Sequence, residues 1–174
     1  MDGPPPIGAC TIGTRKDEIE KRDTTYSMTE TPRLIGINHV ALEVGDLDAA
    51  LDLYGRLFSF ELRGRGPGMA FIDMGDQFLA LAEGRTQPPD DARHFGLVVD
   101  DKEAVRAAVE REGLRVVPGR RLDFYDPWGN RFEVVAYSDI QFDRVPGVKR
   151  KLGIEQLGKT DKAQAEIRER GLSA

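Results

Sequence analysis

The chain contains two histidines, and each begins the same eight-residue phrase. His39 opens HVALEVGD and His94 opens HFGLVVDD, so the pattern H-x-x-L-x-V-x-D recurs after 55 residues. Self-similarity at a fixed spacing is typical of a duplicated supersecondary unit. The sequence therefore predicts that one structural unit occurs twice, with a histidine at the same position in each copy.

Each phrase alternates in the way expected of a strand with one buried face. In the first phrase the residues predicted to face the core are Val40, Leu42 and Val44. His39 and Glu43 would then lie on the opposite face. A duplication would relate the two strands by a pseudo-twofold axis, so the two imidazoles could converge.

A third predicted strand, Arg131–Ala136, places Glu133 among apolar neighbours. An unpaired carboxylate there would cost free energy, and a metal ion would remove that cost. Two histidines and one carboxylate form a facial triad that leaves coordination positions open for substrate. We therefore predict a divalent metal site at His39, His94 and Glu133. Fe²⁺ or Mn²⁺ is favoured, and Zn²⁺, Ni²⁺ or Co²⁺ are the alternatives.

A structural role is the competing interpretation for these histidines. A single histidine at the start of a strand is more often a satisfied surface or core group than a metal ligand. Two independent structural histidines, however, would have no reason to occupy the same register of a duplicated unit. The repetition therefore favours the metal site.

Length and composition indicate a globular protein with one main domain. The chain has 174 residues, of which 40% are hydrophobic, and a net charge of −5, which argues against nucleic-acid binding. The single cysteine, Cys10, allows neither an internal disulfide nor a thiolate cluster, which fits a cytoplasmic location. Residues 1–33 are predicted to be a disordered tail. They hold no apolar segment long enough for a signal peptide or a membrane span.

Both halves of the remaining chain have the same predicted element order. The first half, 34–85, has a strand at His39, a helix after the N-cap Asp46, and three extended segments near 59–63, 69–74 and 77–82. The second half, 92–137, repeats this with Asp101 as the N-cap. Each half therefore reads βαβββ. Residues 138–174 form a C-terminal extension with a predicted helix over 160–170.

Four segments of the chain resemble the vicinal oxygen chelate superfamily, which includes glyoxalase I, extradiol dioxygenases and the fosfomycin- and bleomycin-resistance proteins. These segments are 38–46, the Leu53-Tyr54 pair, 94–99 and the turn with its strand at 126–133. The resemblance covers residues 34–137. It implies an α+β fold in which paired βαβββ modules form a curved mixed-sheet cup with helices outside. It also implies metal ligands at His39, His94 and Glu133.

The chain departs from the patterns of particular family members at three positions. A fourth ligand, Glu in glyoxalase I and Gln in methylmalonyl-CoA epimerase of the same superfamily, is replaced by Ala80. The catalytic Thr of fosfomycin-resistance enzymes is replaced by Ala41, and their phosphonate-binding Tyr by Asp123. The family comparison therefore disfavours glyoxalase I, epimerase and fosfomycin chemistry.

The absence of a third histidine leaves Tyr125, Glu43 and Asp123 as candidate catalytic residues. Tyr125 and Asp123 share one face of a predicted strand next to Glu133, and Glu43 shares the face of His39. Glu43 also fits an exposed carboxylate at a strand end.

Four arginines could bind an anionic substrate, although such residues are usually only solvated: Arg63, Arg65, Arg120 and Arg121.

These features predict a divalent-metal-dependent enzyme, glyoxalase-like or dioxygenase-like, that chelates a small substrate through two oxygens. The alternative is a non-catalytic drug- or metabolite-binding protein of the bleomycin-resistance type, and a third interpretation is an inactive module that only dimerises. We expect a homodimer, because a partner would cover the sheet edges and the apolar cup rims. No nucleic-acid or membrane partner is expected.

Overall fold

The computed structural model describes residues 35–119 and 121–172, and the residues from Gly36 onward form one compact unit. The tail predicted for residues 1–33 lies outside the described residues, as does Cys10. In the part of the chain that the structure describes, no helix is both long enough and apolar enough to cross a membrane.

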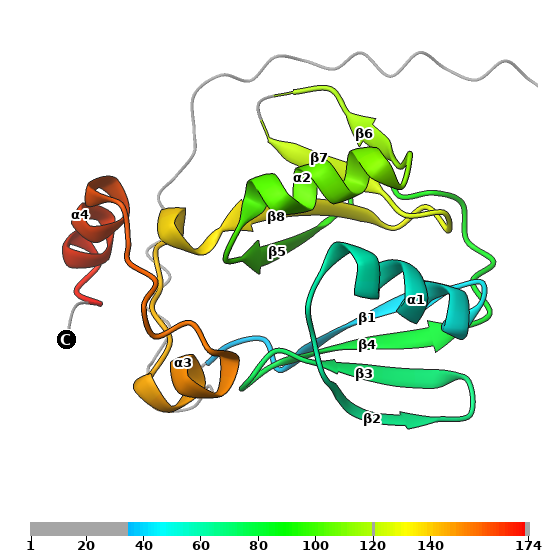
Figure 1. Ribbon diagram of the computed structural model, residues 1–174, viewed down its shortest axis with the longest axis horizontal. Helices are drawn as coiled ribbons and strands as arrows, with labels where there is room; N and C mark the ends of the chain where they lie inside the picture. The colour runs from blue at the N-terminus through cyan, green and yellow to red at the C-terminus, as the bar shows by residue number, and fades with distance from the viewer. Residues whose placement is uncertain (1–34, 120, 173–174) are drawn as a thin grey trace, which may run out of the picture. The chain divides into compact units, whose positions relative to one another are not determined.

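The first module contains one helix and a four-stranded sheet in the order β1-β4-β3-β2 (Figure 1). Strand β1 runs parallel to β4, and the other neighbours are antiparallel. The elements are β1 His39–Val44, α1 Leu47–Leu57, β2 Leu62–Gly66, β3 Met69–Asp73 and β4 Phe78–Glu83. The predicted βαβββ order is therefore confirmed, although β2 begins at Leu62 and not near residue 59.

The second module repeats this arrangement with the strand order β5-β8-β7-β6. Strand β5 runs parallel to β8, just as β1 runs parallel to β4. The elements are β5 Phe95–Val99, α2 Lys102–Arg111, β6 Arg115–Val117, β7 Leu122–Tyr125 and β8 Arg131–Ala136. The duplication predicted from the repeated phrase is thus present in the fold, and the α+β class is confirmed.

Both module helices begin at the aspartates predicted as N-caps. Asp46 Oδ1 accepts a hydrogen bond of 2.8 Å from the Ala49 N–H, and Asp101 Oδ1 accepts one of 2.9 Å from the Ala104 N–H. Each side chain satisfies a backbone donor that has no partner within the helix. The second helix ends before Gly113, whose φ of +65° lies in the left-handed region that glycine adopts easily.

Each sheet has one face covered by a helix and one helix-free face. Alternation in β1 turns Leu42 and Val44 toward α1, and their exposed fractions are 1% and 0%. Phe132 and Val134 of β8 belong to the same buried core. Residues between these positions, such as Glu133, therefore point to the helix-free face, where the predicted site residues lie.

A C-terminal extension follows the second module. It contains the short 3-10 helix η1 Tyr137–Asp139 and the helices α3 Pro146–Leu152 and α4 Asp161–Glu169. The last of these agrees with the helix predicted over 160–170. Helix α3 lies against the β3–β4 turn. Val148 of α3 packs so closely on Gly75 of this turn that a Cβ atom added to Gly75 would come within 2.8 Å of Val148 Cγ1.

Candidate metal centre

His94 lies immediately before β5, and the backbone fixes which of its ring nitrogens carries hydrogen. Its Nδ1 lies 3.0 Å from the carbonyl oxygen of Ala92. A carbonyl oxygen can only accept a hydrogen bond, so Nδ1 is the donor. In the neutral ring Nε2 then carries the free lone pair. Metal-binding histidines are commonly oriented in this way.

Glu133 presents a carboxylate oxygen to that lone pair. The distance from His94 Nε2 to Glu133 Oε2 is 3.3 Å, and the Glu133 side chain is 16% exposed. Strands β5 and β8 are hydrogen-bonded neighbours, with Gly96 opposite Glu133, so backbone pairing brings the two side chains together. Two acceptor atoms that face each other at this distance need a proton or a cation between them.

Arg121 is a second partner of the same carboxylate. Its Nη1 donates to Glu133 Oε2 over 3.1 Å, while the arginine side chain itself is 71% exposed. Arg121 was one of four arginines that the sequence could not rank. The structure distinguishes it, because it places a positive charge beside a predicted metal ligand.

His39 has the same ring orientation as His94 but lies on the first sheet. Its Nδ1 is 2.9 Å from Asn38 Oδ1, which leaves Nε2 free. The ring stacks on Phe78 with the two centroids 4.6 Å apart. The stacking and the hydrogen bond together fix the direction of the imidazole.

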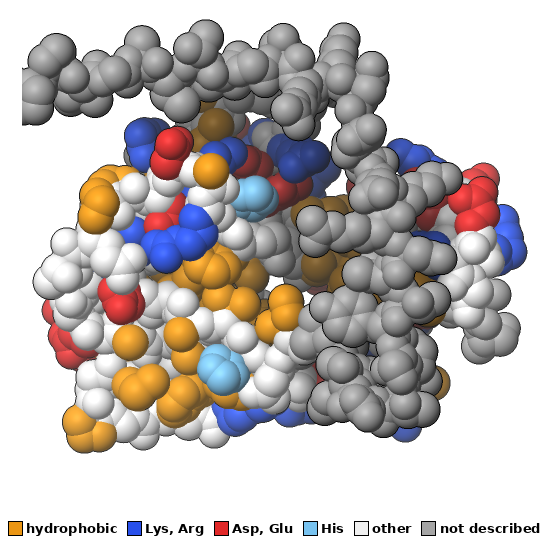
Figure 2. Space-filling view, turned by 180° about the vertical axis from the view of Figure 1, so that it is seen from behind, with side chains coloured by type: hydrophobic (Ala, Val, Ile, Leu, Met, Phe, Trp, Pro, Cys, Tyr) orange, Lys and Arg blue, Asp and Glu red, His pale blue; other side chains and the backbone are white. Residues whose placement is uncertain are grey.

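The two histidines do not meet within one chain. Among the described residues, no group of three or more His, Cys, Asp or Glu side chains is placed to hold a metal ion. Both histidines are visible on the same side of the molecule as separate patches, with hydrophobic side chains between them (Figure 2). One chain therefore supplies His94 and Glu133 together and His39 separately.

Ala80 lies at the position where a fourth ligand was considered. It is paired in register with Ala41 of β1 and with Phe71 of β3, on the same face as His39. Its exposed fraction is 3%. A methyl group offers no donor atom, so this position adds nothing to a ligand set.

Asp123 is the register partner of Glu133 on the neighbouring strand β7. Its Oδ2 accepts a hydrogen bond of 2.6 Å from Arg131 Nη2, and its side chain is 10% exposed. The other oxygen, Oδ1, is buried and has no partner among the described residues. The hydrogen bond to Asp123 raises the pKa of the Arg131 guanidinium above its ordinary value.

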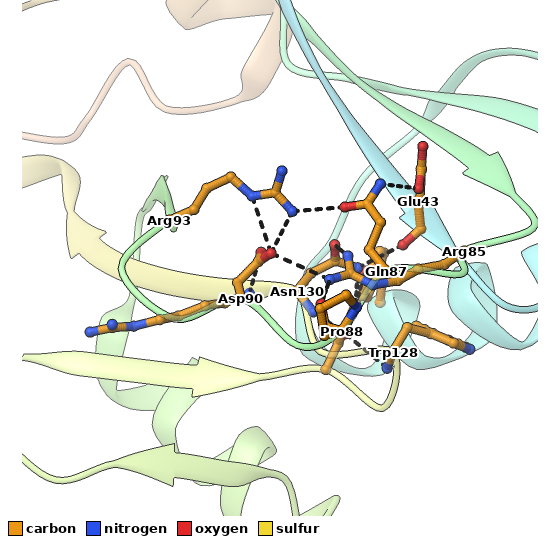
Figure 3. Close-up of polar contacts among 11 residues, drawn as sticks. Glu43, Arg85, Gln87, Pro88, Asp90, Arg93, Trp128 and Asn130 are labelled. Atoms are coloured by element: carbon orange, nitrogen blue, oxygen red, sulfur yellow. Dashed lines mark hydrogen bonds and ion pairs between the residues drawn. The ribbon is translucent and has the colours of Figure 1, made fainter. Parts of the chain in front are cut away.

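The other two candidate catalytic residues already have partners. Tyr125 lies under the guanidinium of Arg115, whose Cζ is 3.6 Å from the ring centroid. Glu43 accepts a hydrogen bond from Gln87 Nε2, and Gln87 Oε1 accepts one of 3.1 Å from Arg93 (Figure 3). Of the three candidates, Asp123 is the one with a buried carboxylate oxygen that has no partner among the described residues.

A buried ionic network joins the linker between the modules to the turn before β8 (Figure 3). The side chains of Arg85 and Asp90 are 3% and 2% exposed and form an ion pair of 3.3 Å. Burial acts to raise the pKa of Asp90, but hydrogen bonds from Arg93, the Arg131 N–H and Arg85 hold it below its usual range. The network fixes the position of residues 85–93, which is the chain segment that leads directly into His94.

The turn before β8 is held by a second buried cluster. Asp126 Oδ2 accepts hydrogen bonds of 2.7 Å from both Tyr54 Oη and Asn130 Nδ2. Asn130 Nδ2 also donates to the carbonyl oxygen of Glu43, across 87 positions of sequence. Burial, followed by the negative charge of Asp126, raises the pKa of the Tyr54 hydroxyl above its ordinary value. This cluster ties the first module to the strand that carries Glu133.

A cavity of about 650 Å³ lies between the modules on the helix-covered side. Its walls come from the end of α1, the start of α2 and the C-terminal extension. Apolar residues that line it include Phe58, Phe60, Leu97, Phe142 and Ile154. None of His39, His94 and Glu133 lines it, so it is separate from the candidate metal centre.

Residues 36–134 match the family described as the Glyoxalase/Bleomycin resistance protein/Dioxygenase superfamily. The chain belongs to this superfamily. The match spans both modules and includes all three predicted metal ligands, so the resemblance expected from the repeated phrase and the Asp126–Glu133 segment is confirmed.

The chain is similar to one curated enzyme and to solved structures of fosfomycin resistance proteins. Metallothiol transferase FosB of Bacillus licheniformis is 25% identical over 130 residues, which cover 67% of this chain and 83% of that protein. The fosfomycin resistance protein FosX of Listeria monocytogenes has a TM-score of 0.52 at 19% identity, over 60% of this chain and 94% of that one. A mutant of the same FosX, solved with Mn(II) and a dihydroxypropylphosphonic acid, has a TM-score of 0.52 at 21% identity, over 60% and 93%. At these identities the solved structures establish the shared fold.

Proposed function

We propose that the protein is a divalent-metal-dependent enzyme that holds a small substrate through two vicinal oxygens. The observation that carries this proposal is the pair His94 Nε2 and Glu133 Oε2, which are 3.3 Å apart with Nδ1 of His94 committed to a carbonyl. A divalent ion with ligand distances of about 2.0–2.2 Å spans two adjacent donors about 3 Å apart. The two side chains therefore fit an ion with little movement.

The third ligand in this proposal is His39 of a second copy of the chain. His39 has a free Nε2 and a fixed ring, but it does not reach His94 and Glu133 of its own chain. Both histidines face the same side of the molecule, so a twofold partner would place His39 of each copy near the pair of the other (Figure 2). The homodimer is thus part of the proposed site.

The set of two imidazoles and one carboxylate favours Fe²⁺ or Mn²⁺. The name of the FosB relative and the Mn(II) found in the FosX mutant support a divalent metal. When bound, such an ion would stabilise negative charge on a substrate oxygen. Asp123 would face the same substrate from the neighbouring strand, and Arg121 would add a positive charge beside Glu133.

The reaction classes we propose for this site are dioxygenase-like chemistry and glyoxalase-like chemistry on a substrate other than the glutathione hemithioacetal of methylglyoxal, because Ala80 supplies no fourth ligand. Fosfomycin is not the substrate we favour, although solved structures with the same fold are of fosfomycin resistance proteins. Ala41 provides no hydroxyl two residues after His39, and Asp123 stands where the family resemblance places a phosphonate-binding Tyr. A substrate without a phosphonate group is consistent with both positions.

The experiment is metal analysis of the purified full-length chain after loading with Mn²⁺ or Fe²⁺ and dialysis. We expect one ion per chain in the wild type and none in the Glu133→Ala variant. Glu103→Ala is the matched control, because Glu103 is an exposed carboxylate on α2. A wild-type protein that retains no metal would overturn the proposal.

A non-catalytic role in small-molecule binding is the second candidate. The cavity of about 650 Å³ favours it, because ligand pockets typically have volumes of about 300–1,000 Å³ and mostly apolar walls. Binding of an apolar fluorescent probe by the metal-free chain would support this role if the variant Ser59→Trp, which fills the cavity wall, abolished it. Probe binding that is unaffected by Ser59→Trp would exclude the cavity.

A further inference from the structure

The C-terminal extension forms one wall of the cavity of about 650 Å³. Four of its apolar residues line the cavity: Phe142, Leu152, Ile154 and Leu157. The extension follows residues 36–134, which are the part of the chain that matches the superfamily. This wall is therefore an addition to the two modules, and the family match does not account for the cavity that it closes.

Paired charges fasten the extension to the first module at the β3–β4 turn. Arg144 donates to Asp76 over 2.5 Å and to Gln77 Oε1 over 3.0 Å. Lys151 of α3 forms an ion pair with Asp73 at the end of β3. The extension begins at the end of β8, so it crosses from the second module to the first (Figure 1). These contacts set its position beside the cavity.

Large apolar side chains in the cavity wall are more than one-third exposed. The exposed fractions are 39% for Phe142 and 38% for Leu152 of the extension, and 39% for Val98 of β5. Apolar surface in water costs free energy in proportion to its area, and a bound apolar molecule would remove that cost. The volume is also typical of cavities that hold small molecules.

Polar side chains in the same wall are already paired within the protein. Asp73 accepts hydrogen bonds from Lys151 and from the Gly75 N–H. Gln77 uses both ends of its amide, since Oε1 accepts from Arg144 and Nε2 donates to the Ile37 carbonyl oxygen over 2.8 Å. These groups therefore offer a ligand no free charge of either sign.

Two aspartates at the start of α2 give the cavity a negative edge. Asp100 and Asp101 both line it. Their Oδ1 atoms accept hydrogen bonds of 2.9 Å from the N–H groups of Asp101 and Ala104, and neither carboxylate forms an ion pair with a described residue. Because like charges repel, these carboxylates disfavour an anionic ligand.

We infer that the cavity binds an uncharged, largely apolar molecule and discriminates against anions, with the C-terminal extension as one wall of the site. This inference rests on the binding role given above as the second candidate function. It adds the chemical class of the ligand and the segment that completes the site. The site is independent of the candidate metal centre, whose three predicted ligands lie outside the cavity lining.

The test uses the full-length chain and two fluorescent probes that share one ring system. N-phenyl-1-naphthylamine is uncharged, and 8-anilinonaphthalene-1-sulfonate carries one added sulfonate. We expect the sulfonate to bind at least about tenfold more weakly than the uncharged probe in a fluorescence titration. Equal affinities, or tighter binding of the sulfonate, would overturn this inference and leave the cavity as a binding site. Absence of binding by both probes would overturn the second candidate function as well.

Asp100→Asn tests the source of the discrimination. The variant keeps an oxygen that accepts the Asp101 N–H but loses the charge. We expect the sulfonate to bind several-fold more tightly and the uncharged probe to bind as it does to the wild type. Asp52→Asn, which removes the same charge from an exposed position on α1, is the control. An unchanged sulfonate affinity in Asp100→Asn would contradict selection by this charge.

Leu152→Asp tests whether the extension is part of the site. It places a charge on the apolar wall at a side chain that is already 38% exposed. We expect the uncharged probe to bind at least about tenfold more weakly, because the charge must lose water when the probe binds. Leu172→Asp, at a 56% exposed position outside the cavity lining, is the matched control. Equal probe affinities in Leu152→Asp and the control would overturn the role of the extension.

Discussion

His94 Nε2 faces Glu133 Oε2 at 3.3 Å, and the backbone carbonyl of Ala92 holds the opposite ring nitrogen as a donor. Glu133 lies within β8 and His94 directly precedes β5, and these two strands are hydrogen-bonded along their length. Rigid strands hold ligand geometry well. The pair is thus the fixed half of the proposed metal centre.

Removing the charge of Glu133 should nearly abolish metal binding. In Glu133→Gln the side chain keeps its size but loses a ligating carboxylate. We expect the dissociation constant for Mn²⁺ to rise by more than about a hundredfold, since even outer-shell changes cost about 10- to 100-fold. Titration followed by electron paramagnetic resonance measures this. An affinity within threefold of wild type would show that Glu133 is not a ligand.

Removing the charge of Arg121 should have the opposite effect. Its guanidinium donates to Glu133 over 3.1 Å and places a positive charge beside the incoming cation. Because like charges repel, Arg121→Gln should bind Mn²⁺ several-fold more tightly, most clearly at low ionic strength. Arg106→Gln, a change on the outside of α2, is the control. Weaker binding by Arg121→Gln would mean that Arg121 mainly orients the carboxylate.

Asp90 should stabilise the fold at neutral pH and cease to do so in acid. Its pKa in the folded chain lies below the ordinary value of 3.8, so its ionised form favours folding above that value. The stabilisation is lost as the pH falls through the folded pKa. Asp90→Asn should cost about 3–5 kcal/mol at pH 7, because it leaves buried Arg85 without its counter-ion.

Urea unfolding at pH 7 and near pH 3 tests the role of Asp90. The difference between wild type and Asp90→Asn should be large at pH 7 and smaller at the acidic pH. A constant difference at both pH values would contradict the assigned direction of the shift.

Glyoxalase turnover should be weak or absent. Ala80 lies on the same face as His39 and supplies no fourth donor atom. We therefore expect little conversion of the glutathione hemithioacetal of methylglyoxal by the enzyme with its native metal, measured by absorbance. Efficient turnover would show that three protein ligands suffice for that reaction.

Local features of the fold were predictable from the sequence because they depend on short-range chemistry. Asp46 and Asp101 cap their helices as expected, and alternation placed Leu42 and Val44 in the core. The repeated phrase also indicated the duplication. Strand β2 was misplaced by about three residues because residues 58–61 contain no turn signal that marks the boundary.

The partners of the site residues were not predictable, because they come from distant parts of the chain. Nothing near Glu133 in sequence identifies Arg121 as its partner, and nothing near Glu43 identifies Gln87. The duplication suggested that the histidines converge, but equivalent positions on two separate sheets do not meet within one chain. Only the three-dimensional arrangement shows that His39 lies apart from His94 within one chain.

The proposed sharing of ligands between two chains is tested most directly by mixing two inactive variants. A chain with His39→Ala and a chain with Glu133→Ala, carrying different affinity tags, are refolded together, and the hybrid dimer is purified by both tags. In the hybrid, His39 of the second chain can meet His94 and Glu133 of the first. We predict one metal ion per hybrid dimer and none in either parent. A hybrid dimer without metal, from a wild type that binds it, would contradict a site shared between chains.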